Sequence, residues 1–201
     1  MLVSIATILS ALLLAGSVSA QTPPGFVPEV ENRLEIIFGS KVVEAPGADL
    51  ERADTANQPT LGTDAPLEGA SYLWAMIDID VPSDFQNPSA GGARTTYLHA
   101  LITGFTPTSS PTNTTTPDGK PIYILTPPQG TAGPVAYVGP APPPENPPHA
   151  HQYVSLLYET AADFAVTPEQ IGSTIGFDVA AFAEAVGLDA PVRAGYFNVT
   201  G

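Results

Sequence analysis

Three runs of aliphatic and aromatic residues stand out along the chain, and each predicts a buried β-strand. They cover residues 72–80, 96–103 and 153–159. Each run is too short for a typical helix, and the first lies between Gly69 and Pro82, residue types that commonly bound strands. Weaker strand signals cover residues 34–38, 41–43, 122–125 and 193–199. The pattern therefore predicts a mainly β protein.

One segment near the C-terminus has a convincing helical period. In residues 178–186, apolar positions recur at i, i+3, i+4 and i+7 starting from Val179. Asp178 is a candidate N-cap and Gly187 follows the last periodic residue, as is typical of helix ends. A shorter helical turn is expected from Pro168, because proline suits the first turn of a helix.

Charge narrows the range of functions. The chain has 20 acidic and 6 basic residues, for a formal net charge of −14. Six basic residues are too few to neutralise a run of phosphates, so no nucleic-acid partner is expected, and an anionic membrane would repel the surface. The chain has no cysteine, which excludes disulfides, thiol catalysis, iron–sulfur clusters and cysteine zinc sites.

The first twenty residues have the layout of a secretory signal peptide. Residues 5–15 are apolar, and small residues at Val18 and Ala20 fit a cleavage site before Gln21. The alternative is a membrane anchor, but the apolar run is short of the ~20 residues that span a bilayer. We therefore expect a signal peptide at 1–20, a single domain at 21–201 without a membrane-spanning segment, and a secreted or vesicle-lumen protein.

Proline-rich connectors separate the predicted elements. Residues 106–121 and 139–148 are expected to be loops, because proline removes a backbone donor and fixes φ. Two glycosylation sequons begin at Asn113, within the first connector, and at Asn198. Export would make both of them candidate glycan sites.

The candidate chemistry lies on the three strong strands. Because side chains alternate along a strand, residues i and i+2 share a face, so neighbouring strands can present one carboxylate, two imidazoles and two phenols to a common cavity. These side chains are Asp78, Tyr97, His99, His151 and Tyr153. Each of them alone is more often a structural residue than a functional one. A shared Asp78–His99–His151 site is the sharper hypothesis.

Other chemistries are less well supported. His149, His151, His99 and Asp78 are valid zinc ligand types, but their spacing is unspecific and no metal is predicted. No Gly-x-Ser-x-Gly motif is present. Residues 172–176 have both glycines of the motif but carry threonine at the nucleophile position. There is also no phosphate-binding glycine loop or dinucleotide fingerprint, so no cofactor is expected.

Read together, these segments resemble the phosphatidylethanolamine-binding protein family. Residues 78–83 (DIDVPS) resemble the family's Asp-Pro-Asp-x-Pro-Ser, and Tyr-Leu-His follows at 97–99. Residues 137–143 (YVGPAPP) and 151–159 (HQYVSLLYE) resemble Gly-Pro-x-Pro-Pro and His-Arg-Tyr-Val…Leu-Tyr-Glu. The chain departs from the family at Ile79, at Gln152, which replaces the usual arginine, and at residues 144–148.

The resemblance implies a β-sandwich with a large central antiparallel sheet, a smaller sheet and few peripheral helices. It also implies a small anion-binding pocket with Asp78, His99 and His151 as its polar floor. The lining residues carried over by position are Val81, Pro82, Tyr97, Gly139, Pro142 and Tyr153. The family often has a cis peptide before the equivalent of Pro82.

Several functions follow from this resemblance. The first is a non-enzymatic protein that binds a small anionic or amphipathic ligand, such as a phosphate, a carboxylate or a lipid headgroup. Protonated His99 or His151 would donate to the anion, so we expect affinity to rise as pH falls. The second is an accessory or catalytic role beside the biosynthetic enzymes of a fungal maleidride pathway, in the dimerising cyclisation of maleic-anhydride-type monomers. His99, His151 and Asp78 would be the catalytic residues. The third is inhibition of a serine carboxypeptidase.

Overall fold

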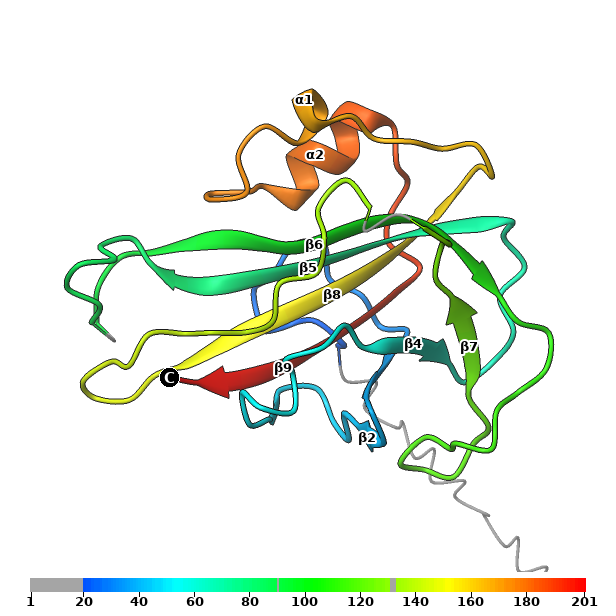
Figure 1. Ribbon diagram of the computed structural model, residues 1–201, viewed down its shortest axis with the longest axis horizontal. Coiled ribbons are helices and arrows are strands. Elements are labelled where there is room, and N and C mark those ends of the chain that lie inside the picture. Colours follow the sequence, from blue (N-terminus) through cyan, green and yellow to red (C-terminus); the bar gives the residue numbers. More distant parts are fainter. Residues whose placement is uncertain (1–19, 90, 131–132) are drawn as a thin grey trace, which may run out of the picture.

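The computed structural model describes residues 20–89, 91–130 and 133–201, and it is built around one curled sheet (Figure 1). The strands run in the order β2-β1-β4-β7-β6-β5-β8-β9-β3. Their bounds are β1 Glu35–Phe38, β2 Lys41–Val42, β3 Ala48–Asp49, β4 Thr60–Thr63, β5 Ser71–Pro82, β6 Arg94–Pro107, β7 Tyr123–Thr126, β8 Ala150–Thr160 and β9 Arg193–Thr200. The helices are α1 Pro168–Ile171 and α2 Val179–Val186. The predicted mainly β architecture is confirmed.

The centre of the sheet is made by the three strands that the apolar runs predict. β5 lies between β6 and β8 and pairs antiparallel with both. Its alternate residues face two separate hydrophobic clusters, with Trp74 and Met76 on one face of the sheet and Ala75 and Ile77 on the other. Burial on both faces explains why β5 reads as a nearly continuous apolar run.

A smaller section of the sheet, β2-β1-β4-β7, folds over one face of the long strands. Its residues Ile36 and Leu61 share a core cluster with Trp74, whose ring meets Phe105 edge-on at a centroid distance of 6.2 Å. β7 joins this section to β6 at Thr106 and Pro107. The expected smaller sheet is therefore a continuation of the large one. β3 also departs from the antiparallel pattern, since it pairs parallel with β9.

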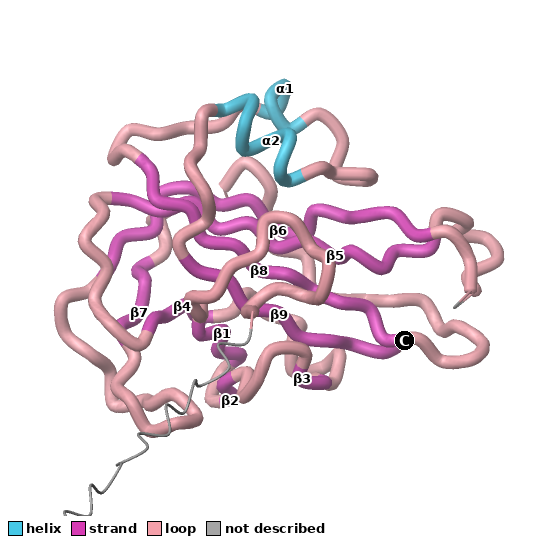
Figure 2. Tube along the Cα trace, turned by 180° about the vertical axis from the view of Figure 1, so that it is seen from behind, coloured by secondary structure: helices cyan, strands magenta, loops and turns pink. Residues whose placement is uncertain are grey.

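The two helices cover the other face of the long strands (Figures 1 and 2). α2 begins as expected, because the Asp178 carboxylate accepts from the backbone N–H groups of Ala180 and Ala181, both at 3.0 Å. It ends at Gly187, which has the left-handed φ of 73° common after helices. α2 packs Phe182 into the cluster on this face.

Three sequence expectations concern positions outside this core. The resemblance permits a cis peptide before Pro82, but the cis bonds among the described residues precede Pro28 and Pro147. Residues 1–19, which carry most of the expected signal peptide, lie outside the described residues. Within the described ranges, no helix has the length and apolar character needed to cross a membrane.

Candidate functional site

Two β-bulges shape one end of the long strands. Met76 pairs with Ala100 and Ile77 with Leu98, which leaves His99 as an extra residue in β6. A second register shift, between Asp78 and Val81, inserts an extra residue into β5. A bulge re-aims the side chains beside it. Both bulges border the same hollow, so the irregular part of the sheet is where the candidate chemistry gathers.

This hollow has a volume of about 370 Å³, within the range of about 300–1,000 Å³ typical of small-molecule sites. The structure brings together here all but one of the residues that the family resemblance placed in a pocket. They are Asp78, Val81, Tyr97, His99, Gly139, Pro142, His151 and Tyr153. Pro82 is separate from them and lines a neighbouring depression with Ser83 and Asp84. We call the 370 Å³ hollow the histidine pocket.

A chain of charged side chains begins at Asp78 and His151, which line the floor of the histidine pocket, and continues behind them to Glu145 and Arg94, which do not line it. The Nδ1 of His151 lies 2.8 Å from Oδ2 of Asp78, and its Nε2 lies 3.1 Å from Oε1 of Glu145. Arg94 donates to both oxygens of Glu145, at 2.8 and 2.7 Å. The Arg94 guanidinium also donates to the carbonyls of Asp80 and Ser89. Two carboxylates thus face one imidazole and one guanidinium.

These contacts set the protonation of the floor. Burial disfavours a charged His151 ring, but the hydrogen bonds and charges of Asp78 and Glu145 outweigh burial and raise the pKa of His151. The bidentate hydrogen bonds from Arg94, opposed by burial and reinforced by His151, lower the pKa of Glu145 to about 2. The raised pKa favours the imidazolium form of His151, in which each ring N–H would face one carboxylate. Both ring nitrogens are already partnered, so the expected role of His151 as an anion donor would require one of these contacts to break.

His99 has the opposite environment. Its Nδ1 lies 2.7 Å from the carbonyl oxygen of Val138, which requires a proton on Nδ1. Burial lowers the pKa of His99, and the Val138 carbonyl and the Asp78 charge offset this only in part. The ring is edge-on to Tyr97 and Tyr153, at centroid distances of 4.8 and 5.1 Å. At neutral pH His99 is thus a neutral imidazole whose Nε2 lone pair has no protein donor in the described part of the chain.

Tyr153 completes the polar side of the pocket. It stands directly opposite Asp78 in the β5–β8 pairing and is fully buried. Burial, together with the nearby Asp78 carboxylate, raises the pKa of Tyr153. Its phenol therefore stays protonated and is a donor rather than an anion.

Glu145 and Arg94 are the functional residues that sequence reasoning missed. Glu145 lies in the proline-rich segment 139–148, which reads only as a loop, and Arg94 lies at the start of β6. The signal in the sequence that could have revealed these two residues is charge balance. A buried carboxylate beside a histidine needs a cation, and the chain has only 6 lysines and arginines to supply one.

His149 lies outside the histidine pocket. Its Nε2 is 3.4 Å from Oδ1 of Asp80, at the edge of the charged floor. The described residues contain no group of three or more His, Asp or Glu side chains placed to hold a metal ion. Nothing in the described geometry therefore brings His149 together with His99, His151 and Asp78 as a ligand set.

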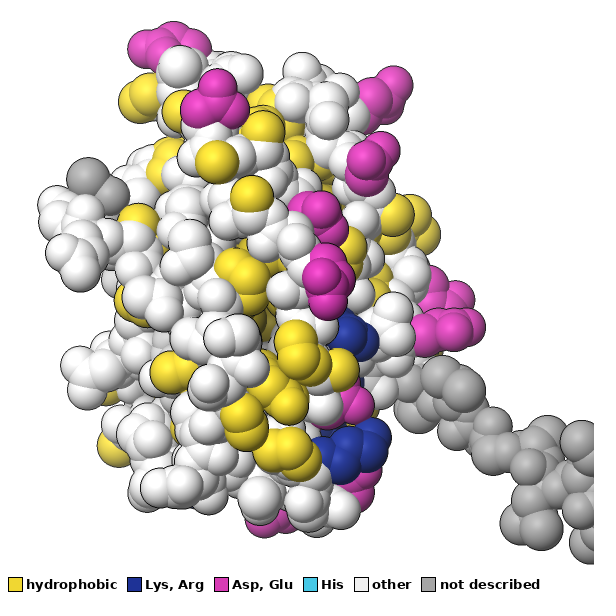
Figure 3. Space-filling view, turned by 90° about the vertical axis from the view of Figure 1, so that its right-hand side faces the viewer, with side chains coloured by type: hydrophobic (Ala, Val, Ile, Leu, Met, Phe, Trp, Pro, Cys, Tyr) yellow, Lys and Arg dark blue, Asp and Glu magenta, His cyan; other side chains and the backbone are white. Residues whose placement is uncertain are grey.

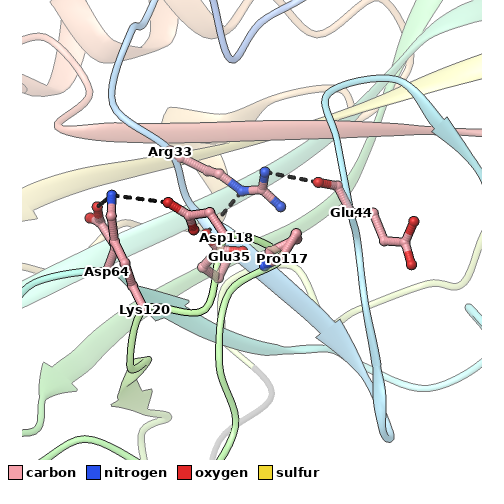
Figure 4. Close-up of a pocket in the computed structure, with 7 residues that line it drawn as sticks. All are labelled: Arg33, Glu35, Glu44, Asp64, Pro117, Asp118 and Lys120. Carbon is pink, nitrogen blue, oxygen red and sulfur yellow. Dashed lines mark hydrogen bonds and ion pairs between the residues drawn. The ribbon is translucent and has the colours of Figure 1, made fainter.

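A second hollow, of about 430 Å³, lies on the smaller section of the sheet (Figure 4). Its cations are already paired, since Lys120 lies 3.1 Å from Asp64 and 3.4 Å from Asp118, and Arg33 lies 2.9 Å from Glu35. Burial raises the pKa of Glu35, although Arg33 opposes this. On the face seen in Figure 3, the few Lys and Arg side chains likewise lie beside acidic ones. Among the described residues that line it, this hollow offers an anion no unpaired cation.

Both predicted sequons lie away from the histidine pocket. Asn113 is exposed in the connector before β7. Asn198 is half-buried in β9, where its Nδ2 donates to the Gly47 carbonyl at 2.8 Å and to Asp49 at 3.3 Å. A glycan on Asn198 would have to displace these hydrogen bonds. A glycan on the exposed Asn113 would not.

Comparisons with known proteins bear on the family and the fold of the chain. The family model described as "Phosphatidylethanolamine-binding protein" matches residues 38–197. A curated protein of Talaromyces stipitatus, "Phomoidride biosynthesis cluster protein N", is 29% identical over 220 residues, covering 95% of this chain and 96% of that protein. The structure of a carboxypeptidase Y inhibitor in complex with its proteinase matches with a TM-score of 0.57 at 16% identity, covering 85% of this chain and 84% of the inhibitor. A phosphatidylethanolamine-binding protein from Plasmodium vivax matches with a TM-score of 0.51 at 16% identity, covering 88% and 91%.

Proposed function

Since the chain belongs to the phosphatidylethanolamine-binding protein family, we propose that it binds a small acidic or amphipathic molecule in the histidine pocket. One observation carries this proposal. His99 is fixed through Nδ1 to Val138, so Nε2 is the ring nitrogen available to a ligand in a hollow of suitable size. The Asp78–His151 pair already has partners within the chain, since His151 also contacts Glu145 and Asp78 also accepts from the Asp80 N–H, and it serves to hold the floor in place.

Binding of an anion at this site depends on the charge of His99. In the floor, the Asp78 and Glu145 carboxylates balance the His151 and Arg94 cations, so no net positive charge attracts an anion. Only a proton on Nε2 of His99 adds an unpaired cation. Because the pKa of His99 is lowered from 6.5, this proton is absent at neutral pH.

We therefore expect the affinity for maleate, a compact dicarboxylate, to be weak at pH 7.5 and to rise as pH falls below 6.5. Isothermal titration calorimetry at both ends of the range from about pH 7.5 to about pH 5 measures this. His99→Asn should reduce the pH dependence to the part that comes from the protonation of maleate itself. His149→Asn, which changes a histidine outside the pocket, should keep the full pH dependence. Equal maleate affinity at all pH values, or an unaffected His99→Asn protein, would contradict the proposed site.

We further propose that the protein acts beside the enzymes of a fungal secondary-metabolite pathway, either as an accessory protein or as a catalyst. The 29% identity to a phomoidride cluster protein over nearly the whole of both chains supports this setting. Neutral His99 suits proton abstraction next to an anhydride carbonyl, which gives an enolate and an imidazolium. The enolate carbon would attack a second monomer, and the imidazolium would return the proton to the product. The Tyr153 phenol would donate to the enolate oxygen.

Export from the cell is part of the same proposal, and glycosylation tests it. After expression in a eukaryotic secretory host, we expect treatment with an endoglycosidase to increase the gel mobility of the protein. Asn113→Gln should abolish this change, because Asn113 is exposed. Asn198→Gln should retain it, since the Asn198 amide is engaged with Gly47. A protein without any glycan, or one modified at Asn198 alone, would count against this part of the proposal.

Protease inhibition is not proposed. The likeness to the carboxypeptidase Y inhibitor rests on 16% identity and shows a shared fold alone.

A further inference from the structure

Exposed apolar side chains surround the mouth of the histidine pocket. The large hydrophobic residues exposed in the described part of the chain are Val27, Phe85, Val138 and Ile175. Phe85, Val138 and Ile175, which are 57%, 47% and 51% exposed, all line this pocket. Val27 lies elsewhere, beside α2. Exposed apolar residues that gather at one mouth mark a binding surface rather than chance exposure. We call these three residues the apolar collar.

The apolar collar is held in place by the same strand that carries His99. The backbone N–H of Val138 donates to the His99 carbonyl at 2.9 Å. Two backbone hydrogen bonds of 2.9 Å join the segment that carries Ile175 to β6. The Leu98 N–H donates to the Thr174 carbonyl, and the Gly176 N–H donates to the Thr96 carbonyl. Phe85 lies in the connection between β5 and β6. Two of the three collar residues are therefore fixed relative to His99 before any ligand arrives, which lowers the ordering cost of binding.

The charges of the pocket do not suit a phosphate. Asp78 and His151 are the charged side chains among the described residues that line the pocket, and they are paired with each other at 2.8 Å. Its remaining lining includes Val81, Ala141 and Pro143. A phosphate monoester head has three unesterified oxygens and keeps at least one full charge, so it would lose more hydration here than a carbonyl or a single carboxyl group, without gaining an unpaired cation at neutral pH.

From these observations we infer that the ligand combines a compact carbonyl or carboxyl head, which reaches His99, with a hydrocarbon tail that covers the apolar collar. The inference rests on the proposed function and names its substrate class. Each methylene that the collar buries is expected to raise affinity about four-fold, until the tail extends past the collar. Phosphate-headed amphiphiles are expected to bind more weakly than carboxyl-headed ones of equal tail length.

The test compares probes that differ in one part only. Maleate, butylmaleate, hexylmaleate and hexyl phosphate are titrated calorimetrically at pH 5.5, because a lower pH favours the proton on His99 that an anionic head needs. We expect affinity to rise from maleate to hexylmaleate by at least a hundred-fold, and hexyl phosphate to bind at least ten-fold more weakly than hexylmaleate. Phe85→Ser and Ile175→Ser should each weaken hexylmaleate at least five-fold and change maleate less than two-fold. Val27→Ser, the matched exposed control, should change neither.

The outcomes separate the inference from the function on which it rests. If maleate binds through His99 but tail length and both collar variants have no effect, the tail inference is overturned and the pocket stands. The same holds if Val27→Ser weakens hexylmaleate as much as Phe85→Ser does. Equal binding of hexyl phosphate and hexylmaleate overturns the choice of head. If no maleate binds, or if His99→Asn binds all probes normally, the proposed function itself fails.

Discussion

Replacing His99 by asparagine is expected to slow the dimerisation of an anhydride monomer by about 10²–10⁴-fold, if the protein catalyses this step as proposed. Asparagine keeps a side chain that can donate to the Val138 carbonyl, but it has no basic nitrogen. The variant should therefore retain the pocket and lose the proton acceptor. The measurement is the initial rate of dimer formation by purified protein, with thermal unfolding to verify that the variant is folded.

The pH profile sharpens this prediction. Proton abstraction requires neutral His99, so the rate should rise with pH through a value below 6.5 and level off at neutral pH. The groups facing His99 are Asp78, His151, Tyr97 and Tyr153, of which His151 and Tyr153 have raised pKa values. Anion affinity should change in the opposite direction. A rate that falls with rising pH, or a His99→Asn protein with full activity, would rule out the base role and leave only a binding role.

Replacing Glu145 by glutamine is expected to lower the free energy of unfolding by about 3–5 kcal/mol at pH 7. The substitution preserves shape but removes the charge that both Arg94 and His151 contact. Removing one charge from a buried ion pair leaves the remaining charges uncompensated. Urea unfolding measures the loss, and Glu184→Gln, on the exposed side of α2, is the matched control with a change below about 0.5 kcal/mol.

The stability of the protein at low pH gives a second measurement of the contribution of Glu145. Its pKa is lowered from 4.5 to about 2 in the folded protein, so the folded state binds fewer protons between these values. The contribution of Glu145 is therefore complete above pH 4.5 and is lost as pH falls toward 2. We expect the Glu145→Gln protein to lack this part of the acid transition. His151 has a raised pKa, so its contribution acts in the other direction and is lost as pH rises through that pKa. Identical acid transitions in the wild-type and variant proteins would contradict the buried Glu145 pair.

Local patterns in the sequence were sufficient for most of the fold. The strand β5 reads as an apolar run because both of its faces are buried, and α2 reads as a helix because its cap, its period and its terminal glycine agree. β4 was missed because Thr60–Thr63 has one large apolar residue and no clear alternation. It is a strand because it fills the gap between β1 and β7. That cause is tertiary and has no local signature.

The candidate site was predictable only in part, because several of the contacts that form it are also tertiary. Alternation along the strands placed His99, His151 and Tyr153 on a shared face, but it carried no information about the bulge that leaves His99 unpaired in the ladder. It also carried no information about the contact between Arg94 and Glu145, which are 51 residues apart in the chain. As a result, the two histidines seemed interchangeable from the sequence. Their hydrogen-bond partners make one of them a fixed cation and the other a neutral base.

The backbone segments beside β6 have a consequence beyond the pocket. Between Thr96 and Leu101, one edge of β6 pairs with β5, while the other receives hydrogen bonds from residues near Val135 and Ile175. An uncovered edge of this length would be a template on which a strand from another molecule could add. Here its amides and carbonyls already have partners within the chain. At high protein concentration, aggregates are therefore not expected to grow by strand addition along this edge of β6.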